Sequence, residues 1–163
     1  MNITLYHGSL ERVETPELRK PSRTLDYGSG FYTTTSQQQA ESWVKRRINE
    51  KDVHKGFVNV YSFDNAALET LHCMVFHAPS VEWVDFVMQN RTQKDFTHDY
   101  DIVYGPVAND RVYAAFALYE GGILGKQELI SELKTYKLVD QYLFHTDRAL
   151  QSLKFIDAKE VNV

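Results

Sequence analysis

The chain has 163 residues, a length that favours a single domain with a sizeable core. Apolar residues make up 43% of the sequence and charged residues 25%, as in ordinary globular proteins. The net charge of −4 argues against a broad phosphate-binding surface, because such surfaces are basic. The single cysteine, Cys73, cannot form an internal disulfide. With no apolar run of about 18 residues and no signal-peptide pattern, the sequence predicts a cytoplasmic protein without a membrane span.

The first third of the chain is predicted to contain strands, a long loop and one helix. Residues 2–7 and 31–34 read as short strands, and the polar segment between them, residues 8–30, reads as a long loop. A helix is predicted to begin at Ser36, because Gln39 three residues later completes a capping-box pattern. Apolar residues then follow at helical spacing up to a charged stretch that ends near residue 55.

The rest of the chain mixes both kinds of element. Residues 66–77 fit neither pattern clearly. We expect strands over 57–63, 100–107, 139–145 and 155–161, and helices from Pro79, over 112–119, over 126–136 and after Thr146. Because strands and helices do not alternate regularly, the pattern favours an α+β fold over a doubly wound sheet, in one domain over residues 1–163.

Three segments contain residues suited to a binding site. In the first, residues 5–9 (LYHGS), a predicted strand ends in His7 and Gly8. A glycine lets a ligand approach the backbone, and a histidine ring can donate to a ribose hydroxyl. Taken alone, a His-Gly pair at a strand end is more often a simple turn.

The second segment is residues 26–34 (DYGSGFYTT), where two glycines precede an aromatic strand. Trp43 lies eleven residues beyond Tyr32 on the predicted helix, so a strand–turn–helix unit can bring the two rings together as a slot for a flat heterocycle. The alternative is a flexible turn before an ordinary core strand.

The third segment is residues 140–144 (DQYLF), in which a polar residue leads an aromatic strand. Strand alternation places Gln141, Leu143 and His145 on one face, and Tyr142 and Phe144 on the other. The alternative is an edge-strand glutamine that faces water.

In this order, the three segments resemble the motifs of diphtheria-toxin-type and poly(ADP-ribose)-polymerase-type ADP-ribosyltransferases, whose triad is His, Tyr and a final Glu that often varies to Gln. The chain is still more similar to a small uncharacterised bacterial family of stand-alone proteins with this triad, some of them suspected toxins of toxin–antitoxin loci. That similarity extends over nearly the whole chain, including residues 100–111 and 141–155. The resemblance implies a split mixed β-sheet with flanking helices, and NAD in the cleft between the half-sheets.

The resemblance also implies roles for individual residues. The triad would be His7, Tyr32 and Gln141, with His7 on the adenosine ribose and Tyr32 stacked on nicotinamide. The remaining cofactor contacts would come from the Gly8 backbone, Ser9, Arg23 on the pyrophosphate, and Trp43 as a second stacking ring. Ala40 falls where many relatives have a serine that binds the carboxamide.

Glutamine at the third position limits the chemistry. It can bind a ribose hydroxyl but cannot offset the positive charge of an oxocarbenium-like transition state, so we expect either slower chemistry or a substrate that supplies its own anion or base. Residues 139–141 (VDQ) lack the Glu-x-Glu of arginine-modifying relatives, which makes arginine modification unexpected. In the polymer-forming relatives chain elongation usually depends on the Glu at the third position, so single-unit transfer is the better prediction. Glu128 and Glu132 are expected to be solvated, although either could act as a distant base.

The predicted function is that of an NAD-dependent mono-ADP-ribosyltransferase with an unidentified protein or nucleic-acid acceptor, with an antitoxin as a further partner in a toxin–antitoxin setting. One alternative is an NAD glycohydrolase, in which water is the acceptor. The other is an inactive module that binds NAD, ADP-ribose or only a partner protein. The spacing of His72, Cys73 and His77 fits no common zinc pattern, so no metal is expected.

Overall fold

The computed structural model describes residues 1–18, 30–92, 98–106, 110–134 and 139–162. Within these ranges the chain forms two β-sheets and six helices, which confirms the predicted α+β class. The first sheet has the order β1-β3-β7 and is antiparallel throughout. The second has the order β2-β6-β5-β4 and is mixed, because β4 runs parallel to β5.

The elements occupy most of the predicted positions. The strands are β1 (Asn2–Ser9), β2 (Phe31–Thr33), β3 (Lys55–Asp64), β4 (Cys73–Val75), β5 (Ile102–Pro106), β6 (Asp140–Phe144) and β7 (Leu153–Asn162). The helices are α1 (Gln37–Lys51), α2 (Ala67–Thr70), α3 (Val81–Thr92), α4 (Asp110–Glu120), α5 (Lys126–Lys134) and α6 (Asp147–Leu150). The segment that fitted neither pattern, residues 66–77, contains α2 and β4.

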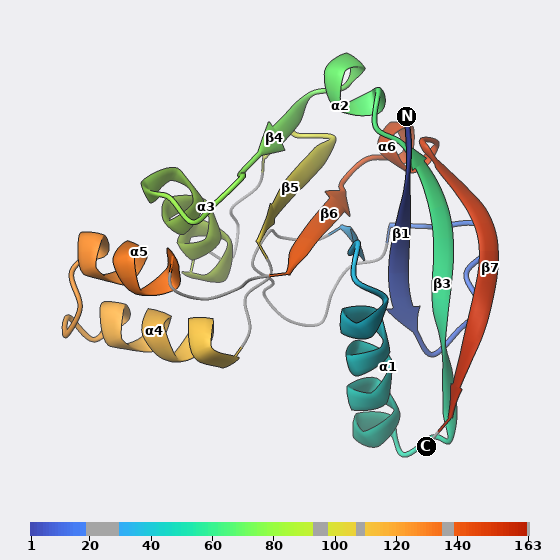
Figure 1. Ribbon diagram of the computed structural model, residues 1–163, viewed down its shortest axis with the longest axis horizontal. Coiled ribbons are helices and arrows are strands. Elements are labelled where there is room, and N and C mark those ends of the chain that lie inside the picture. Colours follow the sequence, from blue (N-terminus) through green and yellow to red (C-terminus); the bar gives the residue numbers. More distant parts are fainter. Residues whose placement is uncertain (19–29, 93–97, 107–109, 135–138, 163) are drawn as a thin grey trace.

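In Figure 1, helices α3, α4 and α5 lie on one side of the second sheet and the first sheet lies on the other, with α1 next to β1. Helix α1 packs on the first sheet through Ala40, Val44 and Ile48, which contact Val58 of β3. The second apolar cluster fills the space between the sheets, where Leu5 and Phe63 of the first sheet meet residues of β2, β5 and β6. The two sheets therefore pack directly against each other through these apolar side chains.

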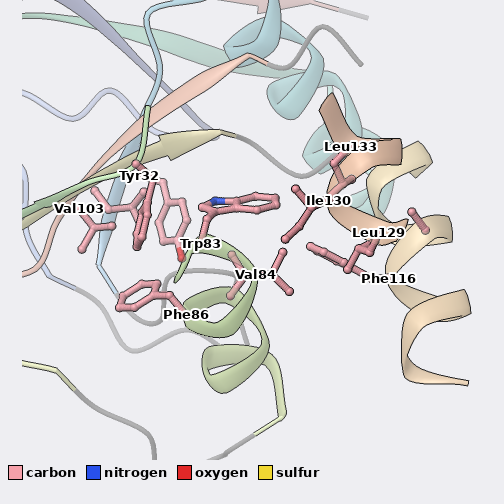
Figure 2. Packing of buried hydrophobic residues seen from close by; sticks show 13 residues of the cluster. Tyr32, Trp83, Val84, Phe86, Val103, Phe116, Leu129, Ile130 and Leu133 are labelled. Carbon is pink, nitrogen blue, oxygen red and sulfur yellow. The ribbon is translucent and has the colours of Figure 1, made fainter. Parts of the chain in front are cut away.

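A third apolar cluster lies between the second sheet and the helices α3, α4 and α5. Figure 2 shows Trp83 of α3 at its centre, with Tyr32 and Val103 on the sheet side and Phe116 of α4 on the helix side. Trp83 and Phe116 are completely buried. This cluster fixes the face of the second sheet from which Tyr32 and Leu143 project.

Helix α1 begins with only half of the predicted capping box. The Ser36 side chain accepts a hydrogen bond from the amide of Gln39 at 3.1 Å, as predicted. The amide of Ser36, which a capping box would pair with the Gln39 side chain, instead donates to Thr34 Oγ1 at 3.1 Å. The Gln39 side chain is therefore not required for the cap.

Asp101 joins the start of β5 to the turn before α6. Its completely buried carboxylate accepts hydrogen bonds from Thr146 Oγ1 at 2.6 Å, from the Arg148 guanidinium at 2.6 and 3.3 Å, and from the His72 amide at 3.0 Å. Burial acts to raise the pKa of Asp101, but these donors and the charge of Arg148 outweigh it and hold the pKa below its usual value.

We expect Asp101→Asn to lower the free energy of unfolding by about 1–3 kcal/mol at pH 7, because hydrogen bonds to a charged acceptor are lost. A carboxylate with a depressed pKa stabilises the fold above its unfolded-state pKa, about 3.9, and this contribution disappears as the pH falls through the folded-state value. Urea unfolding at several pH values measures it. Arg148→Ala is the control and should cost less, since the Arg148 side chain is 68% exposed. An equal gap between wild type and Asp101→Asn at pH 3 and pH 7 would contradict this account.

Candidate functional site

A narrow pocket opens where β1, β2, β6 and the first turns of α1 meet. Its walls consist of residues from β1, from β2 and the helix that follows it, and from β6, namely Tyr6, Gly8, Tyr32, Thr33, Thr34, Gln39, Ala40, Trp43 and Gln141. Four of the predicted site residues, Gly8, Tyr32, Trp43 and Gln141, are thus brought together. Thr34 and Gln39 were not predicted, because sequence signals marked them only as a strand end and a cap.

The two sheets are joined beside this pocket by one backbone pair. Tyr6 and Thr34 exchange two hydrogen bonds of 2.8 and 2.9 Å. A continued ladder would next pair Gly8 with Tyr32. In the described residues the bridge between these segments is confined to Tyr6 and Thr34, and the Tyr32 carbonyl accepts from the His7 ring instead. Because peptide groups two residues apart point the same way, the N–H and C=O of Gly8 are directed into the pocket.

His7 lies beside the pocket and not in its wall. Its ring is on the face of β1 opposite Gly8, where it stacks on Phe31 with 4.0 Å between ring centroids. Its Nδ1 is 2.6 Å from the carbonyl oxygen of Tyr32. Since a carbonyl can only accept, Nδ1 carries the proton of this hydrogen bond. His7 therefore attaches β2 to β1 through a side chain, directly after the last backbone pair.

The absence of a side chain at Gly8 is also required by packing. A Cβ at this position would lie 2.6 Å from the carbonyl oxygen of Ala40 and 3.0 Å from a methyl group of Val44. Helix α1 thus approaches β1 as closely as a glycine allows. The same contact places Ala40 in the pocket wall, at the position where the resemblance led us to compare it with a serine.

Tyr32 and Trp43 lie next to each other, as their spacing predicts. Their ring centroids are 6.2 Å apart and the ring planes differ by 43°. A flat ring between them would need about 3.5 Å on each side and parallel planes. The pocket offers about 10 Å³ of free space, room for about one water molecule. Because Tyr32 is 9% exposed and belongs to the core, Trp43 is the ring that must move to admit a ligand.

Gln141 projects from the second position of β6 into the same pocket. The predicted alternation is observed, since Leu143 lies in the cluster with Tyr32, whereas Tyr142 and Phe144 lie in the cluster between the sheets. Gln141 is 3% exposed, and its Nε2 donates to the Pro106 carbonyl at 3.5 Å, the upper limit for a hydrogen bond. The amide is therefore buried but weakly held.

The remaining predicted site residues lie elsewhere. Ser9 ends β1 outside the pocket wall, and its Oγ accepts from the amide of Glu11 at 3.1 Å. Arg23 falls outside the described residues. Glu128 accepts from the Gly125 amide at the start of α5, and Glu132 lies on the same helix, away from the pocket. No group of three or more potential metal ligands occurs in the described part of the chain.

Residues 3–155 match the model of a family described as a protein of unknown function, DUF3990. The chain belongs to this family. No curated protein and no solved structure matches it. In the ranges that the structure describes, no helix of this family member is long and apolar enough to cross a membrane. The family description names no activity, so the site geometry has to support any function.

We expect His7→Ala to lower the free energy of unfolding by about 1–3 kcal/mol, because the Tyr32 carbonyl loses its donor and Phe31 loses a stacked ring. His7→Asn should lose less, since its side-chain amide can donate at about the same place. Urea unfolding monitored by circular dichroism gives both values. Equal losses for the two variants would show that the hydrogen bond to Tyr32 does not hold the strands together.

Proposed function

We propose that this protein is an NAD-dependent mono-ADP-ribosyltransferase acting on a macromolecular acceptor, in line with the resemblance of its His7, Tyr32 and Gln141 segments. The observation that carries the proposal is the convergence of Gly8, Tyr32, Trp43 and Gln141 on one pocket beside the joint between the sheets. Gly8, Tyr32 and Gln141 come one from each of the three segments that resemble the ADP-ribosyltransferase motifs, and Trp43 lies on the helix that follows the second segment.

With Trp43 moved aside, the groups that line the pocket would suit the nicotinamide end of NAD. A carboxamide offers one acceptor and two donor hydrogens, which match the N–H and C=O that Gly8 directs into the pocket. Tyr32 supplies a fixed ring face, and Trp43 can close on the other side of the nicotinamide. We expect His7 to orient the cofactor indirectly, by holding β2 against β1, and not to transfer protons, because its Nδ1–H is already engaged by the Tyr32 carbonyl.

In the proposed reaction the bond between nicotinamide and the ribose C1 atom breaks, and nicotinamide leaves as a neutral molecule. An acceptor oxygen or nitrogen forms the new bond to C1, and its proton passes to solvent or to a base. Gln141 can hydrogen-bond the ribose hydroxyls but contributes no negative charge to the oxocarbenium-like transition state. We therefore expect slow hydrolysis and a dependence on the acceptor.

The neutral Gln141 supports a second candidate, a module that binds NAD or ADP-ribose without cleaving it. A glycohydrolase differs only in having water as the acceptor. Incubation with NAD labelled in the adenosine part, with and without whole-cell lysate, separates the three. Label on a macromolecule supports the transferase, free labelled ADP-ribose alone supports the glycohydrolase, and intact NAD supports the module.

We predict that Gln141→Glu speeds nicotinamide release and Gln141→Ala slows it. If catalysis is mainly electrostatic, the glutamate should lower the activation barrier by up to about 2–4 kcal/mol. Because residue 141 is buried, the new carboxyl group should have a raised pKa, so the gain should increase with pH as the group ionises. The measurement is nicotinamide release by the three proteins between pH 6 and 9, with and without lysate.

Tyr142→Phe is a matched control, because it changes a neighbouring polar group on the opposite face of β6. It should leave nicotinamide release at the wild-type level. If wild type, Gln141→Glu and Gln141→Ala all bind NAD equally yet none releases nicotinamide, the transferase proposal fails in favour of the binding module.

A further inference from the structure

A second and larger cavity, of about 580 Å³, lies where β4 and β5 end and β6 begins. This volume is in the range of small-ligand sites. Its polar wall is formed by Thr35, His77, Tyr104, Lys134 and Asp140, and its apolar wall by Phe76, Leu133 and prolines.

The two cavities are neighbours. Thr34 and Gln141 line the narrow pocket, and the residues bonded to them, Thr35 and Asp140, line the larger cavity. Gln141 also donates a hydrogen bond to the carbonyl of Pro106, which lines the larger cavity. The two cavities therefore share the ends of β5 and β6, and a second substrate held in the larger one would lie beside the residues of the pocket.

Asp140 is the anionic group of the larger cavity. One carboxylate oxygen accepts from the hydroxyl and the amide of Thr35, at 2.5 and 3.3 Å, and the other accepts from Tyr104 Oη at 2.9 Å. All three donors are neutral, and none of the ion pairs found among the described residues includes Asp140. A carboxylate has about four lone-pair sites, so one acceptor position and a full negative charge remain for a ligand.

The surroundings of Asp140 favour a cation. Burial, the hydrogen bond to Asp140 and its negative charge all raise the pKa of Tyr104, so this ring stays neutral and presents an aromatic surface. Lys134 lines the same cavity and is exposed, but it makes no ion pair with Asp140. The net charge of −4 of the whole chain disfavours a polyphosphate chain as the ligand.

We infer that the larger cavity is the acceptor subsite of the proposed transferase, and that Asp140 selects a polypeptide acceptor by binding one of its basic side chains. The role as an acceptor subsite rests on the proposed transferase function. The binding of a basic side chain is argued from the cavity alone and does not depend on that function. The residue bound by Asp140 is a recognition element and need not be the residue that is modified.

The first test uses binding without NAD. Isotope-labelled protein is titrated with N-acetyl-lysinamide and N-acetyl-argininamide, and with N-acetyl-glutamate amide as the anionic control, while the amide signals of Thr35, Tyr104 and Asp140 are followed by NMR. We expect saturable shifts with at least one cationic probe, weakened by added salt, and none with the anionic probe.

Two variants separate recognition from a structural role. Asp140→Asn should weaken binding of the cationic probe about tenfold, the scale of one lost charge-assisted hydrogen bond. Tyr104→Phe keeps the ring but releases an acceptor position on Asp140, so binding should be as tight as in wild type or tighter. If Asp140 only supports the fold, Tyr104→Phe should weaken binding as well. Glu69→Gln, which removes an exposed charge on α2, is the matched control and should bind like wild type.

The outcomes distinguish this inference from the proposed function. No shift with either cationic probe, or equal shifts with the anionic probe, overturns the subsite. Stronger shifts of the same signals by a 12-nucleotide single-stranded DNA overturn it in favour of a nucleic-acid acceptor.

Should Asp140→Asn not fold, the comparison of probes on wild type and Tyr104→Phe still decides. Nicotinamide release by wild type is measured separately, so release without probe binding overturns only the subsite, and probe binding without release overturns only the transferase.

Discussion

The site depends on the point at which the two sheets stop pairing with each other. Tyr6 and Thr34 form a complete backbone pair, and at the next position the His7 ring takes the Tyr32 carbonyl that Gly8 would otherwise bind. The His7 side chain thus ends the backbone pairing between β1 and the segment that contains β2. The N–H and C=O of Gly8 are left directed at the pocket. Unpaired backbone groups in a fold are costly unless water or a ligand satisfies them, which makes this interruption a reasonable place to expect a ligand.

The residues of the pocket also hold the fold together, which limits how the site can be changed. Tyr32 belongs to the core cluster around Trp83, and Gly8 admits the backbone of Ala40. Substitutions at these two positions are expected to change stability as well as the proposed binding of NAD. Trp43 and Gln141 are less constrained, because Trp43 is only partly buried on α1 and the Gln141 amide has a long hydrogen bond. Evolution and experiment can alter binding and chemistry at these two residues with the smallest effect on packing.

Local patterns predicted much of the fold and part of the site. The alternation in β6 placed Gln141 on the correct face, and the spacing between Tyr32 and Trp43 predicted their contact. What these patterns could not predict arises from tertiary packing. The four-residue helix and three-residue strand within residues 66–77 are too short for a periodic signal. The position of His7 outside the pocket wall, and the cavity beside Asp140, depend on how separate segments meet.

We propose that the backbone N–H and C=O of Gly8 receive the carboxamide of NAD. The direct measurement is the amide NMR signal of Gly8 during titration with NAD, in wild type and in Trp43→Ala. We expect saturable shifts at Gly8 and Thr34, with an affinity reduced by roughly 1–3 kcal/mol in the variant, on the scale of one lost stacking ring. Unchanged Gly8 and Thr34 signals at saturating NAD, or shifts confined to another part of the molecule, would overturn this assignment.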